Sequence, residues 1–325
     1  MILILSLLAA ILPTLFYVAL IYWVDRYEKE PTSLILAAFL WGAIPSIIAA
    51  FIFNTAFSIP FYLLSEGFGD FVGASIIAPL IEESLKGFAL LGIFFFWRHE
   101  LDSPLDGIIY GAMVGMGFAM VENVFYFLNV YNEQGTSAWQ MTIFLRAILF
   151  GLNHALFSSM TGLGLAVARL SRNQGIHFVA PLVGWSSAVL LHAIHNASAS
   201  IGGLFCLLLL VSDFGGILLT LVIIVWALWQ ESRWIKDYLA EEVEQGLLTQ
   251  EQWQTASSTL GRTRHGLALL SSHGLSGYRA AARFYQRCAE LAYKKHHFVL
   301  FNHGQDQERA NRLRTEIAAL SQQIM

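Results

Sequence analysis

Charged residues are scarce in this 325-residue chain, because Lys, Arg, Asp and Glu make up only 13% of it, against roughly one-quarter in soluble domains. The formal net charge is −4 and no dense basic stripe is present, so nothing indicates a nucleic-acid partner. Cysteine is also scarce: Cys206 and Cys288 do not form a disulfide framework of the kind found in small secreted proteins. The zinc-protease motif H-E-x-x-H and internal repeats are absent as well.

Hydrophobic residues, in contrast, make up 56% of the chain, and the mean hydropathy is +0.57, which is typical of an integral membrane protein. The first apolar run lacks a basic start and is long enough to cross a bilayer, so we expect a retained span and no cleaved signal peptide. Runs of spanning length lie at about 2–24, 33–57, 73–97, 107–130, 140–168, 179–199 and 204–230. The sequence therefore predicts an all-α fold, a polytopic membrane helix bundle of about seven transmembrane helices.

The polar residues are concentrated at the C-terminal end, where 22 of the 42 Lys, Arg, Asp and Glu residues fall in positions 231–325. We expect a membrane domain over 1–230 and a soluble helical tail over 231–325, with a Gly/Ser break near HGLALLSSHGLSG. Lys and Arg follow the first, third, fifth and last predicted spans and are absent after the others. This alternation predicts a multi-pass protein of the cell membrane with its N-terminus outside and its tail in the cytoplasm.

Ionisable side chains interrupt several of these apolar runs, although burying one in hydrocarbon costs roughly 2.5 kcal/mol or more. On the third predicted span, APLIEESLKG places Glu82 and Glu83 four and three residues before Lys86. A lysine at these spacings lies on the same side of a helix and can hold one carboxylate ionised. The other carboxylate would then hold a proton, a water or a metal, as general acid/base chemistry needs, and the simpler alternative is a structural ion pair.

The fourth predicted span, DGIIYGAMVGMGFAMVENVFYF, carries an F-x-x-x-E-N motif that ends in Glu122 and Asn123. Its glycines Gly107, Gly111 and Gly115 recur every four residues, which predicts a helix side that allows close approach of a neighbouring helix. Glu122 could serve chemistry or merely bind a neighbouring helix.

Histidines occur on the next two predicted spans, His154 in GLNHALFSSM and His192 in LHAIHNASA. His192 and Asn196 are one turn apart and face the same way, so they could bind a metal and its neighbouring groups or donate hydrogen bonds to an oxyanion. At 1.5 Å per residue, Glu83, Glu122, His154 and His192 lie roughly 12 to 21 Å below the outer boundary. This common level predicts one polar site within the bundle, in its outer half.

The ordered series of EE-x-x-K, F-x-x-x-E-N, the His154 helix and H-x-x-x-N resembles the motifs of the PrsW family of intramembrane proteases. That family is related to the CAAX-protease and bacteriocin-processing superfamily, and the resemblance covers about residues 75 to 200. It implies cleavage of a single-pass membrane protein, such as an anti-sigma factor, within the lipid bilayer. The candidate catalytic residues are Glu82, Glu83, Glu122, His154, His192 and Asn196.

Two mechanisms are compatible with these residues. In one, a divalent metal ion such as zinc acidifies a bound water, with Glu83, Glu122, His154 and His192 as candidate ligands. Glu82 could take the place of Glu83 as the ligand, and the remaining glutamate would then act as the general base. In the other, a glutamate activates the water without a metal, and His192 with Asn196 stabilises the oxyanion. Glu82 and Glu83 point about 100° apart, so only one faces the site directly, and we expect Glu83 to be the base.

Two other functions remain open at this point: an ion-coupled transporter, and a catalytically idle scaffold or immunity protein with the same fold. A transporter of this kind would be expected to have broken helices in paired repeats, and the sequence shows none. Asp213 interrupts the last apolar run, and we expect Ser212 or Asp213 to cap the final helix after an external turn, with a buried functional acid or an additional span as alternatives.

Overall fold

The computed structural model describes residues 1–302, 304–322 and 324, in which helices and short connections occur and no strand does. The all-α prediction is therefore confirmed. The chain divides into two compact units, one of residues 1–24 and 30–223 and the other of residues 25–29 and 224–325. We expected the boundary at 230/231, and the loop 25–29 was not expected in the C-terminal unit.

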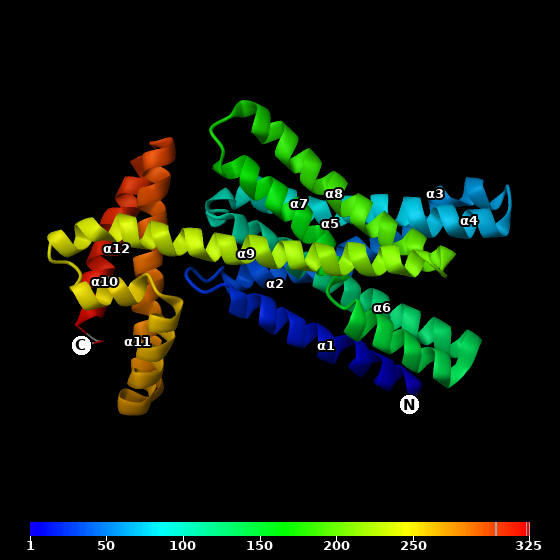
Figure 1. Cartoon of the computed structure of the whole chain (residues 1–325), viewed down its shortest axis with the longest axis horizontal. Helices are drawn as coiled ribbons and strands as arrows, with labels where there is room; N and C mark the ends of the chain where they lie inside the picture. The colour runs from blue at the N-terminus through cyan, green and yellow to red at the C-terminus, as the bar shows by residue number, and fades with distance from the viewer. Residues whose placement is uncertain (303, 323, 325) are drawn as a thin grey trace. The chain divides into compact units, whose positions relative to one another are not determined.

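The first unit contains the apolar helices α1 to α8 and the first part of α9, which are labelled in Figure 1. Their bounds are α1 Ile2–Val24, α2 Thr32–Trp41, the π-helical turn η1 Gly42–Ser46, α3 Ile47–Tyr62, α4 Glu66–Val72, the π-helical turn η2 Gly73–Ile77, α5 Ala78–Phe96, the short 3₁₀ turn η3 Arg98–Glu100, α6 Pro104–Ile143, the π-helical turn η4 Phe144–Leu149, α7 Asn153–Leu170, α8 Gln174–Ile201 and the first part of α9 Phe205–Glu244.

Five segments of the described chain are long and apolar enough to cross a membrane: Ile2–Val24, Thr32–Tyr62, Pro104–Leu170, Gln174–Ile201 and Phe205–Glu244. The protein is thus a multi-pass membrane protein. The third segment has 67 residues, which is far more than the roughly 20 residues that one crossing needs. Helix α5, with two glutamates and a lysine in its apolar sequence, is not among the five, so a total of about seven crossings stays a prediction.

Helix α6 begins at a capping box, which explains why the chain turns helical at this point. The Ser103 hydroxyl accepts a hydrogen bond from the Asp106 backbone N–H, and the Asp106 carboxylate accepts one from the Ser103 N–H at 2.6 Å. Pro104 occupies the first turn, where no backbone donor is needed. Near the other end, Gly135 has φ +80°, a left-handed conformation that suits glycine, and it interrupts the helical geometry of α6. The residues between the predicted spans 107–130 and 140–168 are thus mostly helical and belong to α6.

The last span begins where its apolar run begins, near residue 204, and not at the turn expected around Ser212 and Asp213. Gly202 and Gly203 have φ values of +68° and +58° and form the turn after α8, so that α9 is already helical at Phe205. The prediction that Ser212 or Asp213 caps this helix is wrong, because both lie within α9 and Asp213 is buried. Two consecutive glycines provided a better turn signal than the S-D pair, since glycine adopts positive φ without steric cost.

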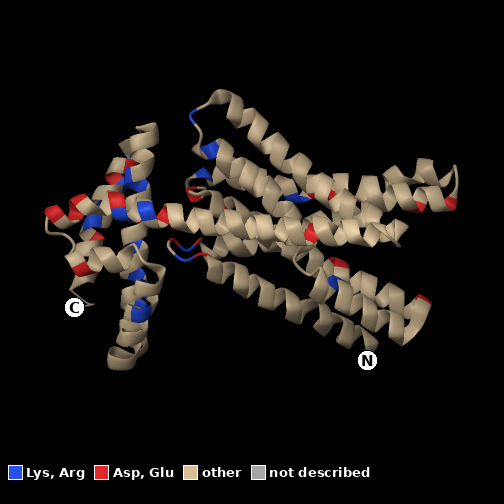
Figure 2. Ribbon diagram, in the orientation of Figure 1, with Lys and Arg blue, Asp and Glu red and all other residues tan. Residues whose placement is uncertain are grey.

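The second unit contains the rest of α9 with α10 Gln250–Ala256, α11 Thr259–Phe301 and α12 Gly304–Ser321. Figure 2 shows that charged residues crowd these helices, whereas α1 to α8 are mostly uncharged. Helix α11 is interrupted at Gly274, which has φ +65°, inside the predicted Gly/Ser break.

Tyr27, from the loop between α1 and α2, lies in the core of this second unit and is only 4% exposed. Its hydroxyl donates to the Ser257 carbonyl at 3.2 Å, while Arg262 donates to the Tyr27 carbonyl at 2.8 Å and lies over the Tyr27 ring. The second unit is thus completed by a residue from near the start of the chain.

Candidate active site

Three charged residues of α5 form the centre of the candidate site. The Lys86 ammonium lies 2.8 Å from Glu83 Oε1 and 3.7 Å from Glu82 Oε2, as the i,i+3 and i,i+4 spacings predict. Lys86 and Glu83 are fully buried, and Glu82 is 5% exposed. The ammonium also lies 3.9 Å from the centroid of the Phe118 ring, on α6. The lysine therefore compensates charge for both carboxylates.

Both carboxylate oxygens of Glu83 already accept hydrogen bonds from neighbouring helices. The Ser158 hydroxyl on α7 donates to Oε2 at 3.0 Å, and His192 Nδ1 on α8 lies 3.0 Å from Oε1, which also accepts from Lys86. An ionised carboxylate can only accept, so His192 carries its proton on Nδ1 and its lone pair on Nε2. A carboxylate that holds a histidine in this way is the usual neighbour of a metal-binding imidazole.

Glu82 differs from Glu83 in having an oxygen without a hydrogen-bond partner. Asn54 on α3 donates to Oε1 at 3.2 Å, whereas the buried Oε2 accepts no hydrogen bond from any described residue. Oε2 lies 4.0 Å from His192 Nε2, which is too long for a hydrogen bond. Glu82 thus presents an acceptor oxygen to the histidines.

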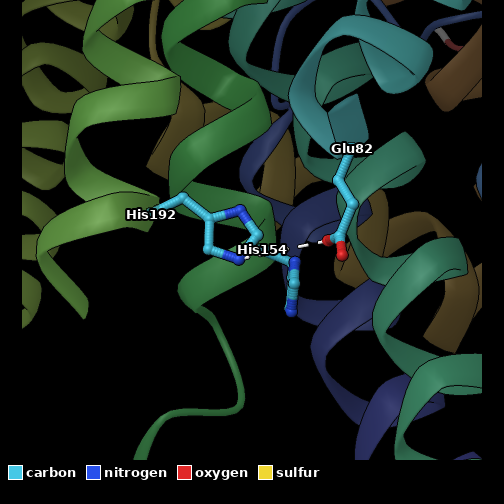
Figure 3. A group of neighbouring side chains, drawn as sticks. All are labelled: Glu82, His154 and His192. Atoms are coloured by element: carbon cyan, nitrogen blue, oxygen red, sulfur yellow. Dashed lines mark ion pairs between the residues drawn. The ribbon is translucent and has the colours of Figure 1, made fainter. Parts of the chain in front are cut away.

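His154 on α7 completes a three-residue group with Glu82 and His192, shown in Figure 3. One ligand atom from each residue can be chosen so that all three lie within 4.8 Å of one another. Two imidazoles and one carboxylate are a common ligand set of catalytic zinc, with a further position left for water. Glu82 Oε2, which accepts no hydrogen bond from the described residues, and the lone pair of His192 fit a divalent cation.

His154 is itself oriented by two charged groups. Its Nε2 lies 3.0 Å from Glu122 Oε2, and its Nδ1 lies 3.0 Å from the Lys86 ammonium. Glu122 accepts a hydrogen bond from the Nε2–H of His154, which leaves the Nδ1 lone pair to accept from Lys86 or to bind a metal ion. A cation bound to Nδ1 would therefore replace the contact with Lys86.

Arg146, on the π-helical turn η4, contacts Glu122 and is not among the residues predicted from the sequence. Its guanidinium pairs with the Glu122 carboxylate, donates to Asn123 Oδ1 at 2.9 Å and stacks over the Tyr126 ring. A single arginine inside a predicted span was the signal that could have revealed it. With Arg146 included, the site holds three carboxylates against two permanent cations, Lys86 and Arg146, and this excess of acid favours a bound proton or metal ion.

The glycine stripe of α6 brings α7 and its histidine close, as the spacing predicted. A Cβ atom at Gly115 would lie 2.1 Å from the carbonyl oxygen of His154, and one at Gly111 would lie 2.4 Å from that of Ser158. At Gly107 the nearest atom would be the carbonyl oxygen of Gly162, at 2.3 Å. These pairings run in opposite directions along the two helices, so α6 and α7 pack antiparallel with backbones in direct contact.

The structure thus brings together five of the six predicted catalytic residues, namely Glu82, Glu83, Glu122, His154 and His192. The sixth, Asn196, donates from Nδ2 to the carbonyl of Ala74 in η2 at 2.8 Å. The predicted metal ligands included Glu83 and Glu122, whereas the geometry groups Glu82 with the two histidines. Glu83 and Glu122 instead each hold one imidazole.

Comparisons with known proteins identify the family of this chain. The sequence model of the "PrsW family intramembrane metalloprotease" matches residues 30–229. The chain is similar to a protein named "Protease PrsW" from Geobacillus kaustophilus, with 32% identity over 191 residues, covering 58% of this chain and 75% of the relative. It is 32% identical to the Bacillus subtilis protein of the same name over 168 residues, covering 51% of this chain and 70% of the relative. The Clostridioides difficile protein is 29% identical, covering 58% and 76%. No solved structure matches the chain.

Proposed function

Because this chain belongs to the PrsW family of intramembrane metalloproteases, and is therefore a protease, we propose that Glu82, His154 and His192 form the centre that hydrolyses the peptide bond. The proposed substrate is a single-pass membrane protein, in the manner of an anti-sigma factor. The observation that carries the assignment is the buried Glu82 Oε2, which accepts no hydrogen bond from the described residues and faces two imidazoles.

In this proposal the three residues would hold a divalent ion such as zinc. A bound ion of this kind acidifies a water molecule and polarises the scissile carbonyl. The surrounding residues position the ligands: Glu83 fixes the tautomer of His192, Glu122 fixes that of His154, and Lys86 balances the two carboxylates of α5. The deep burial of Glu83 and Lys86 keeps bulk water away from these contacts.

In a metal-free form of the mechanism, the same oxygen has a different role. Glu82 Oε2 would accept the proton of the attacking water, and a protonated His192 would donate a hydrogen bond from Nε2 to the oxyanion. Both forms place Glu82 at the reaction centre and assign Glu83 an orienting role.

We further propose that the N-terminus lies outside the cell and the C-terminal unit in the cytoplasm. The alternation of Lys and Arg along the chain supports this orientation. The core position of Tyr27 adds support, because it places the loop after α1 on the same side of the membrane as α10 to α12.

The test uses the purified full chain and a single-pass membrane protein that it cleaves. Glu82→Gln and His192→Ala should each reduce cleavage by about 10²-fold or more, the range for loss of a positioned acid or base. Glu83→Ala should also abolish cleavage, because His192 loses its hydrogen-bond acceptor. The matched control is Glu66→Gln, which removes the charge of an exposed glutamate on α4. Normal cleavage by Glu82→Gln and His192→Ala would refute the assignment.

A chelator distinguishes the two forms of the mechanism. Removal of bound metal from the wild-type protein should stop cleavage, and Zn²⁺ added back should restore it, if the three residues act through an ion. Cleavage that continues in metal-free protein would contradict the metal form and leave Glu82 as the base.

A further inference from the structure

A second buried polar cluster lies beside the proposed centre and joins three helices of the first unit. Asp213 of α9 accepts at Oδ2 from Asn153 of α7 at 2.9 Å and from His195 of α8 at 2.7 Å. Asp213 is 1% exposed and Asn153 is 3% exposed. Because a carboxylate in an apolar span is costly, its retention at this depth calls for a specific partner or function.

The first part of α9 packs on the bundle mainly through small and apolar side chains around this carboxylate. A Cβ atom at Gly216 would lie 2.8 Å from the Leu156 side chain, and Ile217 packs against the buried cluster that contains Leu156 and Phe157. Within this contact Asp213 supplies directional bonds, which apolar packing alone does not.

The two residues that Asp213 binds are closely linked to the two histidines of the proposed centre. Asn153 is the first residue of α7 and directly precedes His154, and His195 follows His192 by three residues on α8. The start of α7 has no side-chain cap, and the Asn153 side chain at this end of the helix donates to Asp213 and lies 2.9 Å from His195 Nδ1. One carboxylate therefore connects the ends of α7 and α8 that present the two imidazoles.

Phe157 provides a second mechanical connection between the two clusters. Its ring stacks on His192 with centroids 4.9 Å apart and lies 6.1 Å from the ring of His195. A shift of His195 would thus be transmitted to His192 by direct packing as well as through the backbone of α8.

We propose that Asp213 is a positioning residue that sets the separation of His154 and His192 by binding Asn153 and His195. This inference rests on the proposed function, since it concerns the geometry of the same centre. It also gives the last span a role in the chemistry, because the group that fixes the two imidazoles comes from α9.

Three substitutions separate positioning from simple stabilisation. Asp213→Leu removes both bonds, and we expect Zn²⁺ affinity to fall by about 10- to 100-fold, as for loss of other groups that orient metal ligands. Asp213→Asn keeps an acceptor oxygen in place and should remain within about fivefold of wild type, because a neutral bond has roughly half the strength of a charged one. Asp213→Glu keeps the charge but moves the carboxylate by one methylene, and it should weaken Zn²⁺ binding while the protein still folds. The control is Thr220→Ala on α9, whose hydroxyl donates to the Gly216 carbonyl of its own helix at 2.9 Å.

The measurements are Zn²⁺ affinity of the purified full chain, the absorption spectrum of the Co²⁺-substituted protein, thermal unfolding, and cleavage. The proposal expects weaker Zn²⁺ binding and an altered Co²⁺ spectrum for Asp213→Glu at an unchanged unfolding temperature. If Asp213→Leu does not fold, the Asp213→Glu and Asp213→Asn pair still decides the question.

The outcomes distinguish this inference from the proposed function. Wild-type Zn²⁺ affinity in Asp213→Glu and Asp213→Leu, with cleavage of the substrate by the wild type, would overturn the positioning role alone. A wild-type chain that cleaves without binding Zn²⁺ would overturn the inference and the metal form together. A wild-type chain that neither binds Zn²⁺ nor cleaves any single-pass protein would contradict the proposed function itself.

Discussion

The contact between Gly115 and His154 allows a quantitative prediction for Gly115→Ala. The added Cβ would lie 2.1 Å from the His154 carbonyl oxygen, and ordinary contact begins at 3.4 Å, so α6 and α7 must separate by about 1.3 Å at this level. Overpacking of this kind costs about 1–3 kcal/mol, partly offset by the roughly 1 kcal/mol by which alanine favours a helix over glycine. Because the shift acts on the backbone of a proposed metal ligand, a displacement near 1 Å should reduce cleavage by about 10²-fold.

The assay compares cleavage of the same single-pass substrate by the wild type, Gly115→Ala and Gly92→Ala. Gly92 lies in α5, and a Cβ there would meet no atom of the described chain within 4 Å, so it controls for the change in helix propensity. We expect Gly92→Ala to cleave normally and Gly115→Ala to lose cleavage with weaker Zn²⁺ binding. Normal cleavage and Zn²⁺ binding by a folded Gly115→Ala would refute the view that close packing of α6 sets the position of His154.

Two further predictions test contacts that the sequence did not reveal. Arg146→Met should reduce cleavage by about 10-fold or more, while Arg146→Lys should retain part of the activity. The reason is that the cation pairs with Glu122 and so holds the carboxylate that orients His154. Equal activity of the two variants would contradict this role of the positive charge. Tyr27→Ala should destabilise the C-terminal unit by about 3–5 kcal/mol, because a buried aromatic ring is lost. Limited proteolysis of α10 to α12 should then be faster than in the wild type. Unchanged proteolysis would show that the Tyr27 side chain does not stabilise this unit.

The sequence predicted the general location of the site because polar residues in apolar spans have few structural explanations. The cost of burying Glu82, Glu83, Glu122 and the two histidines is evident from composition alone, and helical rise places them at one depth. The structure groups these five residues for the same reason, since each carboxylate or imidazole needs a polar partner.

The sequence could not predict which atoms face one another. Glu82 and Glu83 are adjacent, and only the presence of Ser158 on another helix shows that Glu83 is already fully bonded and that Glu82 is not. Asp213 was misjudged for a similar reason: its partners Asn153 and His195 are distant in sequence, and a local pattern offers only local explanations such as a helix cap.

The insertion of Tyr27 into the C-terminal unit has a consequence for biosynthesis. Tyr27 leaves the ribosome early, but its bonding partner Ser257 is made 230 residues later. The aromatic ring therefore lacks its packing partners during most of translation. The C-terminal unit can complete its core only after the apolar helices have been synthesised. A reporter protein fused in place of α10 to α12 would leave that ring permanently uncovered, so fusions made to map the orientation of the chain are better attached after α12.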